Sequence, residues 1–166
     1  SGFYTYIKDG NEYWTPTNEP CRTKPEKWQS AHGMGYSRFE AERNGIKACE
    51  TYFVGPYENA LIWNLKITSD TDKKITLFPY VELGMMEFMR ELQWQCYNKH
   101  QLSAYPMDDI LVYKYGVEMQ PKPDETPLIY FASDAKISGY DCDRDEFVGS
   151  YRRKSKEYRK RSMYKY

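Results

Sequence analysis

Tyr36-Ser-Arg-Phe-Glu-Ala-Glu-Arg43, Asn44-Gly45 and Ile46-Lys-Ala-Cys-Glu-Thr-Tyr-Phe-Val54 follow one another without interruption, and this stretch decides the fold. Two runs of alternating apolar and polar residues flank an Asn-Gly dipeptide, which is the strongest short-range signal of a β-hairpin. A tight hairpin turn needs residues that tolerate positive φ, as asparagine and glycine do. The stretch therefore predicts two antiparallel strands, residues 36–43 and 46–54, joined by a two-residue turn.

Two further pairs of runs lie on either side of this hairpin. Phe3–Ile7 and Glu12–Thr15 flank Asp9-Gly10, another dipeptide that tolerates the positive φ of a tight turn. Residues 60–67 and 74–82 flank a polar stretch and predict a third hairpin. Pro79 lacks the backbone N–H that a ladder needs, so its strand is expected to have the proline at a sheet edge or a bulge.

The remaining segments add a loop, a helical stretch and more strands. Residues 16–31 contain three of the nine prolines and predict a long ordered loop. Over residues 84–101, apolar residues recur from Met85 at helical spacing, which predicts a short helix or helical loop. Strand patterns resume over residues 110–119 and 128–133. Seven or eight strands in antiparallel hairpins predict an all-β fold, an antiparallel β-sandwich with one short helical segment.

Length and composition indicate one ordinary domain. With 166 residues the chain is long enough to bury a single core, and its 17 tyrosines suit the half-buried faces of strands. No apolar run approaches the ~20 residues of a membrane span and no secretion signal is evident, so we expect a cytoplasmic protein without a membrane partner. The four cysteines lack metal-binding spacing, which predicts reduced, partly buried thiols and no metal site.

Charge is segregated along the chain. Residues 152–166 contain eight Lys or Arg and one Glu, whereas residues 1–151 carry 16 basic and 23 acidic groups. The basic tail and its interleaved tyrosines have the composition that contacts nucleic-acid phosphates and bases. Because the tail is short and terminal and follows an acidic body, we expect a disordered tail and no nucleic-acid partner.

Few patterns of known chemistry occur. Asp141, Asp143 and Asp145 alternate like the first ligands of a calcium loop, but Glu146 replaces the required glycine, so a solvated, hydrogen-bonded turn is expected. The glycines that follow His32 predict a turn there in preference to a ligand contact. Two histidines and no nucleophile elbow leave few ways to build a catalytic triad. The sequence predicts neither a catalytic residue nor a cofactor in this chain.

The four tryptophans have flat rings that suit the C–H side of a sugar. Trp63 lies in a predicted strand, where a core position is the better interpretation. Trp28 and Trp94 fall in a predicted loop and in the predicted helical stretch, where a sugar contact and a structural role both stay open.

Five segments in order along residues 3–152 carry a family resemblance. They are Asp9-Gly-Asn-Glu-Tyr-Trp-Thr-Pro16, His32-Gly-Met-Gly-Tyr-Ser37, Glu42-Arg-Asn-Gly-Ile46, Thr76-Leu-Phe-Pro-Tyr-Val-Glu82 and Asp141-Cys-Asp-Arg-Asp-Glu-Phe-Val-Gly-Ser-Tyr151. Together they resemble the signature blocks of glycoside hydrolase family 94, in particular the cellodextrin and cellobiose phosphorylases. The resemblance ends at Arg152, so we expect residues 1–152 to form a partial N-terminal β-sandwich domain and residues 153–166 a basic tail.

The resemblance implies inverting phosphorolysis by a larger enzyme. In this family, inorganic phosphate is the co-substrate and attacks the anomeric carbon of a β-linked glucose oligosaccharide, which gives glucose 1-phosphate. The general acid belongs to an (α/α)6 barrel that would follow the sandwich, so this chain alone is expected to have no turnover. The family's sandwich mediates homodimer contact, which implies a homodimer for the full-length enzyme.

The resemblance also implies candidate substrate-binding residues. Family members often carry a Gln-Arg pair before Asn-Leu-Ser, on a loop that reaches the partner's active site. This sequence has Lys99-His100 before Gln101-Leu-Ser103, so Lys99 and His100, together with Trp94, are the candidate sugar-binding residues. Lys99 and His100 fit an ordinary surface position equally well.

Three functional hypotheses follow, of which the third is a nucleic-acid binder that uses the basic tail. The first is an accessory, carbohydrate-binding and dimerisation domain of a cellodextrin or cellobiose phosphorylase. The second is a stand-alone, non-catalytic sugar-binding β-sandwich module. A partial sandwich is also expected to leave a strand edge or an inner sheet face uncovered.

Overall fold

The computed structural model describes residues 2–83, 102–115 and 128–148. The chain divides into two compact units, Ser1–Gly84 and Met85–Tyr166. Ten strands and one short helix form within the described residues, and all strand pairs are antiparallel. The predicted all-β antiparallel fold is therefore confirmed, with more strands than the seven or eight expected.

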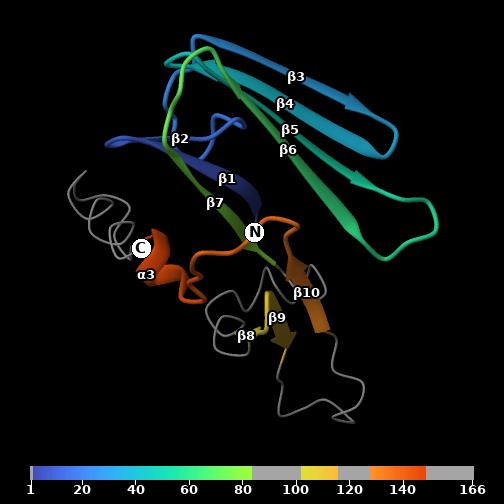
Figure 1. The fold of residues 1–166 in the computed structure, drawn as a ribbon. Coiled ribbons are helices and arrows are strands. Elements are labelled where there is room, and N and C mark those ends of the chain that lie inside the picture. The colour runs from blue at the N-terminus through green and yellow to red at the C-terminus, as the bar shows by residue number, and fades with distance from the viewer. Residues whose placement is uncertain (1, 84–101, 116–127, 149–166) are drawn as a thin grey trace. The chain divides into compact units, whose positions relative to one another are not determined.

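Two sheets make up the first unit. The three-stranded sheet has the order β2 (Glu12–Trp14), β1 (Gly2–Asp9), β7 (Ile75–Glu82). The four-stranded sheet has the order β3 (Lys27–Gly33), β4 (Tyr36–Arg43), β5 (Ile46–Val54), β6 (Leu61–Ser69). Figure 1 shows the longer strands of the four-stranded sheet running side by side from blue through green.

The central hairpin forms as predicted. Strands β4 and β5 pair from Tyr36↔Phe53 to Arg43↔Ile46. Asn44 and Gly45 have φ values of 52° and 71°, which is the left-handed conformation that their dipeptide favours. The first hairpin is also confirmed, with Asp9 opposite Glu12.

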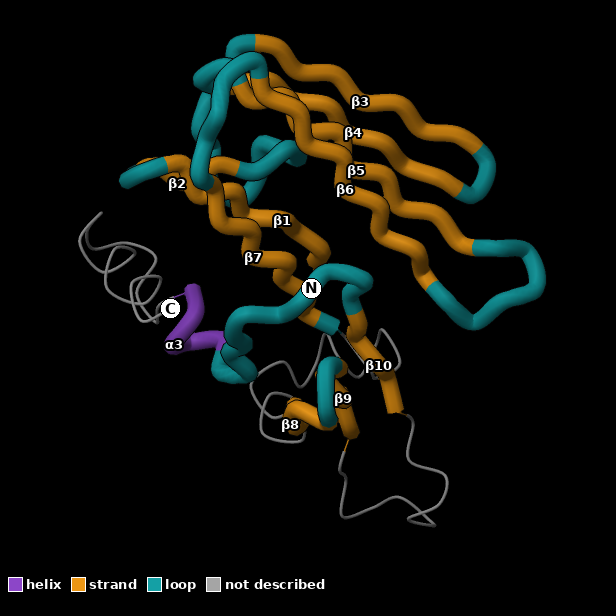
Figure 2. Tube along the Cα trace, viewed as in Figure 1, coloured by secondary structure: helices purple, strands orange, loops and turns teal. Residues whose placement is uncertain are grey.

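The third predicted hairpin is wrong, although both of its strands exist. Strand β6 pairs with β5, and β7 pairs with β1 over eight residue pairs. The connection between them crosses from one sheet to the other, as the teal loop between β6 and β7 in Figure 2 shows. Lys73 holds this crossing in place, because its Nζ donates hydrogen bonds to Asp9 Oδ2 at 3.1 Å and to the Asn44 carbonyl at 2.6 Å.

Proline placement follows the expectation. Pro79 lies opposite Thr5 in β7, which is an edge strand of the three-stranded sheet among the described residues. A proline costs little there, because the outer side of an edge strand needs no backbone donor.

The predicted loop over residues 16–31 is too long, because strand β3 begins at Lys27. This strand pairs only with β4 within the described sheet, and all of its residues are exposed. An edge strand of this kind is held by its backbone ladder, so its sequence lacks the apolar alternation that marks a buried strand. The predicted turn after His32 is present, with Gly35 at φ 81° between Gly33 and Tyr36.

The core lies between the two sheets of the first unit. Its fully buried members come from β1, β2, β4 and β5, and Ile67 and Ile75 pack against them. The buried set is Ile7, Trp14, Ala41, Ile46 and Ala48. Two facing antiparallel sheets around one core are the sandwich that the sequence predicts.

The second unit contains a three-stranded meander. Its order is β10 (Leu128–Ala132), β9 (Ile110–Tyr115), β8 (Leu102–Met107). Strands β9 and β10 match the strand patterns at residues 110–119 and 128–133, whereas β8 is not predicted. The helical stretch expected at residues 84–101 and the basic tail lie outside the described residues.

The aspartate-rich segment of the second unit begins a short helix, α3 (Arg144–Val148), so the expected turn is only its entry. Asp143 Oδ1 accepts the backbone N–H of Glu146 at 3.1 Å, and Asp141 Oδ1 accepts that of Asp143 at 2.9 Å. The Asp143 carboxylate therefore caps the start of α3, and the Asp141 carboxylate forms the turn that precedes it. Within the residues that the structure describes, no helix is long and apolar enough to cross a membrane.

Candidate functional site

The outer face of the four-stranded sheet is the part of the first unit where functional side chains gather. Alternation along β5 sends Ile46, Ala48 and Glu50 into the core, so that the residues between them point outward. Residues that lie directly opposite each other on neighbouring strands have their side chains on the same face of the sheet. The outward residues of β3, β4 and β6 therefore follow from the pairing with β5. We call this surface the outer face; the opposite surface, which the three-stranded sheet partly covers, is the inner face.

A row of large apolar side chains crosses one end of the outer face. Tyr36 lies opposite Phe53, and Phe53 lies opposite Ile62. These side chains are 44%, 40% and 41% exposed. Gly33 pairs with Tyr36, and a Cβ at Gly33 would lie 2.2 Å from a ring carbon of Tyr36, so the ring lies over the glycine. The row offers flat aromatic surface to a ligand.

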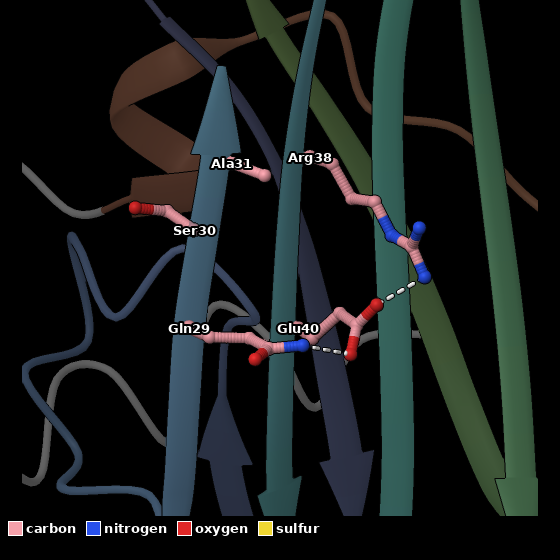
Figure 3. Close-up of a pocket in the computed structure, with 5 residues that line it drawn as sticks. All are labelled: Gln29, Ser30, Ala31, Arg38 and Glu40. Atoms are coloured by element: carbon pink, nitrogen blue, oxygen red, sulfur yellow. Dashed lines mark hydrogen bonds and ion pairs between the residues drawn. The ribbon is translucent and has the colours of Figure 1, made fainter.

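A polar cluster lies farther along the same strands. Gln29 Nε2 donates to Glu40 Oε2 at 2.6 Å, and Arg38 forms an ion pair with the other oxygen of Glu40. Arg38 Nε also donates to Cys49 Sγ at 3.2 Å. Figure 3 shows Gln29 of β3 and Arg38 of β4 reaching Glu40, which is also on β4, while the Ser30 side chain points away from the cluster. A shallow depression lies beside the cluster, and the residues that line it are Gln29, Ser30, Ala31, Arg38 and Glu40.

The electrostatics of this cluster favour binding over proton transfer. The hydrogen bond from Gln29, together with the charge of Arg38, lowers the pKa of Glu40 below its ordinary value. Glu40 is therefore an ionised hydrogen-bond acceptor at neutral pH and is poorly suited to act as a general acid. Among the described residues, no group of acidic, histidine or cysteine side chains is arranged to hold a metal ion. Charged and amide groups beside aromatic rings suit recognition of a polar ligand.

A second unusual carboxyl, Glu50, is fully buried on β5. Its Oε1 accepts hydrogen bonds from Thr5 Oγ1 at 2.5 Å and from Trp63 Nε1 at 2.7 Å. Burial raises the pKa of Glu50, and the hydrogen bonds from Thr5 and Trp63 oppose that rise. A raised carboxyl pKa is a common mark of a catalytic acid. Glu50 has no exposed surface, however, so no substrate reaches it, and its role is to join β1, β5 and β6 across the sandwich.

Aromatic rings surround this buried carboxyl. Tyr52 and Trp63 lie with their ring centroids 5.3 Å apart, and Phe3 meets Trp63 edge-on at 6.3 Å. The Tyr52 hydroxyl donates to the Phe3 carbonyl at 3.3 Å. Trp63 is half-buried here, in keeping with the core position expected for it.

The residues predicted for sugar binding, Trp94, Lys99 and His100, all lie outside the described residues and stay predictions. Trp28 is 46% exposed and its Nε1 donates to the Pro16 carbonyl at 2.9 Å, which ties β3 to the preceding loop.

The outer-face cluster was not singled out from the sequence. The sequence feature that points to this cluster is the alternate set of residues along β4 whose side chains face outward. They are Tyr36, Arg38, Glu40 and Glu42. That phase becomes informative only when the partner strands that place Gln29 and Phe53 beside it are known.

Comparison with known proteins places the chain in a family. The family model described as "Glycosyl hydrolase 94, supersandwich domain" matches residues 1–156. The chain is 32% identical over 161 residues to the N,N'-diacetylchitobiose phosphorylase of Vibrio proteolyticus, and the match covers 91% of this chain. It is also 26% identical over 152 residues to the solabiose phosphorylase of Paenibacillus borealis, covering 89% of this chain.

These matches concern only a small part of each relative. The chain spans 19% of the length of both phosphorylases. The family model covers nearly the whole chain, and the first unit has the two facing antiparallel sheets of a sandwich. The chain therefore belongs to the glycosyl hydrolase 94 supersandwich-domain family.

Proposed function

We propose that this chain is an accessory domain of an inverting glycoside phosphorylase and that it contributes carbohydrate binding and dimerisation. The observation that carries the proposal is the family match over residues 1–156, in a chain that spans 19% of its phosphorylase relatives. A domain of that size supplies surface and positioning, while the reacting groups come from elsewhere in the enzyme. We propose a soluble, cytoplasmic setting for this enzyme, with inorganic phosphate as its co-substrate and no bound cofactor.

The chemistry of the whole enzyme defines what the domain must support. A phosphate oxygen forms a bond to the anomeric carbon with inversion as the glycosidic C–O bond breaks, and a general acid protonates the departing oxygen. Among the described residues, Glu50 is buried and Glu40 is held ionised, so neither supplies that proton. Since the family resemblance implies that the general acid belongs to a barrel outside this chain, we expect the chain by itself to show no turnover.

The proposed substrate is a β-linked glucose oligosaccharide, with cellobiose and cellodextrins as the candidates that the signature segments suggest. The relatives are named for other sugars, namely N,N'-diacetylchitobiose, solabiose and 3-O-beta-D-glucopyranosyl-beta-D-glucuronide. Since the reacting sugar would be held mainly by the rest of the enzyme, the acceptor is best tested by comparing all of these sugars in one assay.

Complementation tests the accessory role. The V. proteolyticus relative would be expressed without the part that this chain matches, and phosphate-dependent release of sugar 1-phosphate would be measured after adding this chain. The removed part of the relative is the positive control, and this chain with Ile7→Asp, which places a charge in the core, is the matched negative control. We expect association and partial recovery of activity. Neither association nor recovery, while the positive control works, would contradict the proposal.

A stand-alone sugar-binding module is the second candidate. The observation that favours it is the exposed row of Tyr36, Phe53 and Ile62 beside a polar cluster. Saturable sugar binding by this chain without any association in the complementation assay would support the stand-alone module over the accessory domain.

A further inference from the structure

We propose that the outer face of the four-stranded sheet binds a neutral, β-linked oligosaccharide, with one sugar ring stacked on Tyr36 and Phe53 and hydroxyls bonded to the next row of side chains. The proposal rests on the carbohydrate-binding role proposed above and assigns that role to a site. It places the site on β4, β5 and β6 and does not involve Trp94, Lys99 or His100.

The stacking surface and the hydrogen-bonding groups occupy adjacent rows. Register places Arg38 opposite Thr51, and Thr51 opposite Asn64, two residues along the strands from the aromatic row. Two residues of a strand span about 7 Å, so the two rows are close enough for one bound oligosaccharide to contact both. A pyranose needs this combination, because its C–H side is apolar while its rim carries hydroxyl groups.

Arg38, Thr51 and Asn64, which we call the polar row, have hydrogen-bonding groups that can bind a ligand. Within the described part of the chain, the side chains of Thr51 and Asn64 form no hydrogen bond. Arg38 uses its Nε on Cys49 and its Nη2 on Glu40, which holds the guanidinium in place and leaves Nη1 for a ligand. The Thr51 hydroxyl and the Asn64 amide can both donate to and accept from sugar hydroxyls, whereas the Arg38 guanidinium only donates.

Charge balance and shape favour an uncharged sugar over a protein partner. In the row of the proposed hydrogen bonds Arg38 is the one charged side chain, and Glu40 neutralises it. Farther along the outer face, Lys27 Nζ lies 2.9 Å from Glu42 Oε2, and Lys47 and Lys66 also point outward. The small side chain of Ala31, opposite Arg38, leaves the shallow depression beside the polar groups. A protein interface would instead have an apolar centre, whereas here polar groups lie at the middle of the sheet.

An NMR titration of the 15N-labelled chain with cellotetraose tests the site. We expect saturable shifts of the backbone amides around Tyr36, Thr51 and Asn64, with a millimolar dissociation constant. Phe53→Ala should weaken binding about tenfold, in line with the loss of one stacking contact. The control is Val54→Ala, because Val54 is the next residue, is 53% exposed and points to the inner face. This variant should bind as the unmodified chain does.

A third variant keeps the test decisive if Phe53→Ala loses the fold. Phe53→Trp retains a flat ring and should bind at least as tightly as the unmodified chain, with dispersed amide signals as proof of folding. The proposal is overturned if no saturable shift occurs, if Val54→Ala weakens binding as much as Phe53→Ala, or if Phe53→Trp folds and does not bind. Each of these results is independent of the complementation assay, so the site can fail while the accessory role stands.

Discussion

Glu50 is a carboxyl at a position where the alternation of β5 calls for an apolar side chain. Ile46, Ala48, Glu50 and Tyr52 share one face of the strand, and only partners from other strands make the carboxyl tolerable there. Thr5 is 45 residues away in sequence and Trp63 is 13 residues away. The hydrogen bonds to Oε1 offset part of the cost of burying the carboxyl, and they depend on tertiary pairing, so the sequence alone does not distinguish Glu50 from a surface glutamate.

The raised pKa of Glu50 makes the stability of the first unit depend on pH. The folded state holds the proton more tightly than the unfolded state, whose glutamate pKa is about 4.3. Stability from this group is therefore complete below that value and falls as pH rises through the folded pKa. Glu50→Gln keeps an oxygen for Thr5 and Trp63 but does not ionise. We expect its advantage in free energy of unfolding over the unmodified chain to grow as pH rises above the unfolded pKa, and a series from about pH 5 to pH 8 covers this rise.

Urea unfolding at several pH values measures this difference. Glu12 and Glu40 have pKa values lowered by hydrogen bonds, from Arg43 and Gln29 respectively, so their contributions are lost as pH falls. Both contributions are common to the two proteins and cancel in the comparison. Parallel stability curves for the unmodified chain and Glu50→Gln would show that Glu50 does not titrate in this range and that its burial has no effect on the pH dependence.

At the scale of elements, tight turns could be predicted and sheet membership could not. Asn44-Gly45 and Asp9-Gly10 specify their hairpins locally, because the turn geometry depends on the residues in the turn. Strands β6 and β7 are also neighbours in sequence, but their connection crosses from one sheet to the other. Hydrogen bonds from Lys73 to Asp9 and Asn44, which are distant in sequence, hold this connection. Strand β3 was missed for a related reason, because an exposed edge strand needs no apolar periodicity.

Gly45 provides a direct test of the central turn. Its φ of 71° is a conformation in which a side chain costs roughly 1–2 kcal/mol, and a Cβ there would meet no atom within 4 Å. We expect Gly45→Ala to lower the free energy of unfolding by about 1 kcal/mol through backbone strain alone. Gly55→Ala is the matched control, since a Cβ there makes only ordinary contacts, the nearest at 3.5 Å, and no positive φ is required. Equal losses in chemical denaturation for the two variants would refute this account.

At the scale of the whole molecule, the first unit is well covered at one end and open at the other. Along the inner face of β5, Ile46, Ala48 and Glu50 are fully buried, whereas Val54 is 53% exposed. Its cross-strand neighbour Leu61 is 42% exposed. Apolar side chains at this end of the inner face are therefore exposed, while the expectation of a face left uncovered by a partial sandwich stays a prediction. The sequence did not locate the open end, because which strands cover which part of a sheet depends on long-range pairing.

Exposed apolar surface of this kind promotes association, so we expect the isolated chain to self-associate through the open end. The double variant Val54→Lys, Leu61→Lys places two like charges opposite each other on the paired strands β5 and β6. It should weaken self-association by about tenfold or more. Sedimentation velocity over a range of concentrations measures this change. Thr68→Lys is the control, because it adds charge to an exposed, outward position of the same strand β6. Two results would contradict this prediction. One is an unmodified chain that stays monomeric at every concentration, and the other is a Thr68→Lys variant that weakens self-association as much as the double variant does.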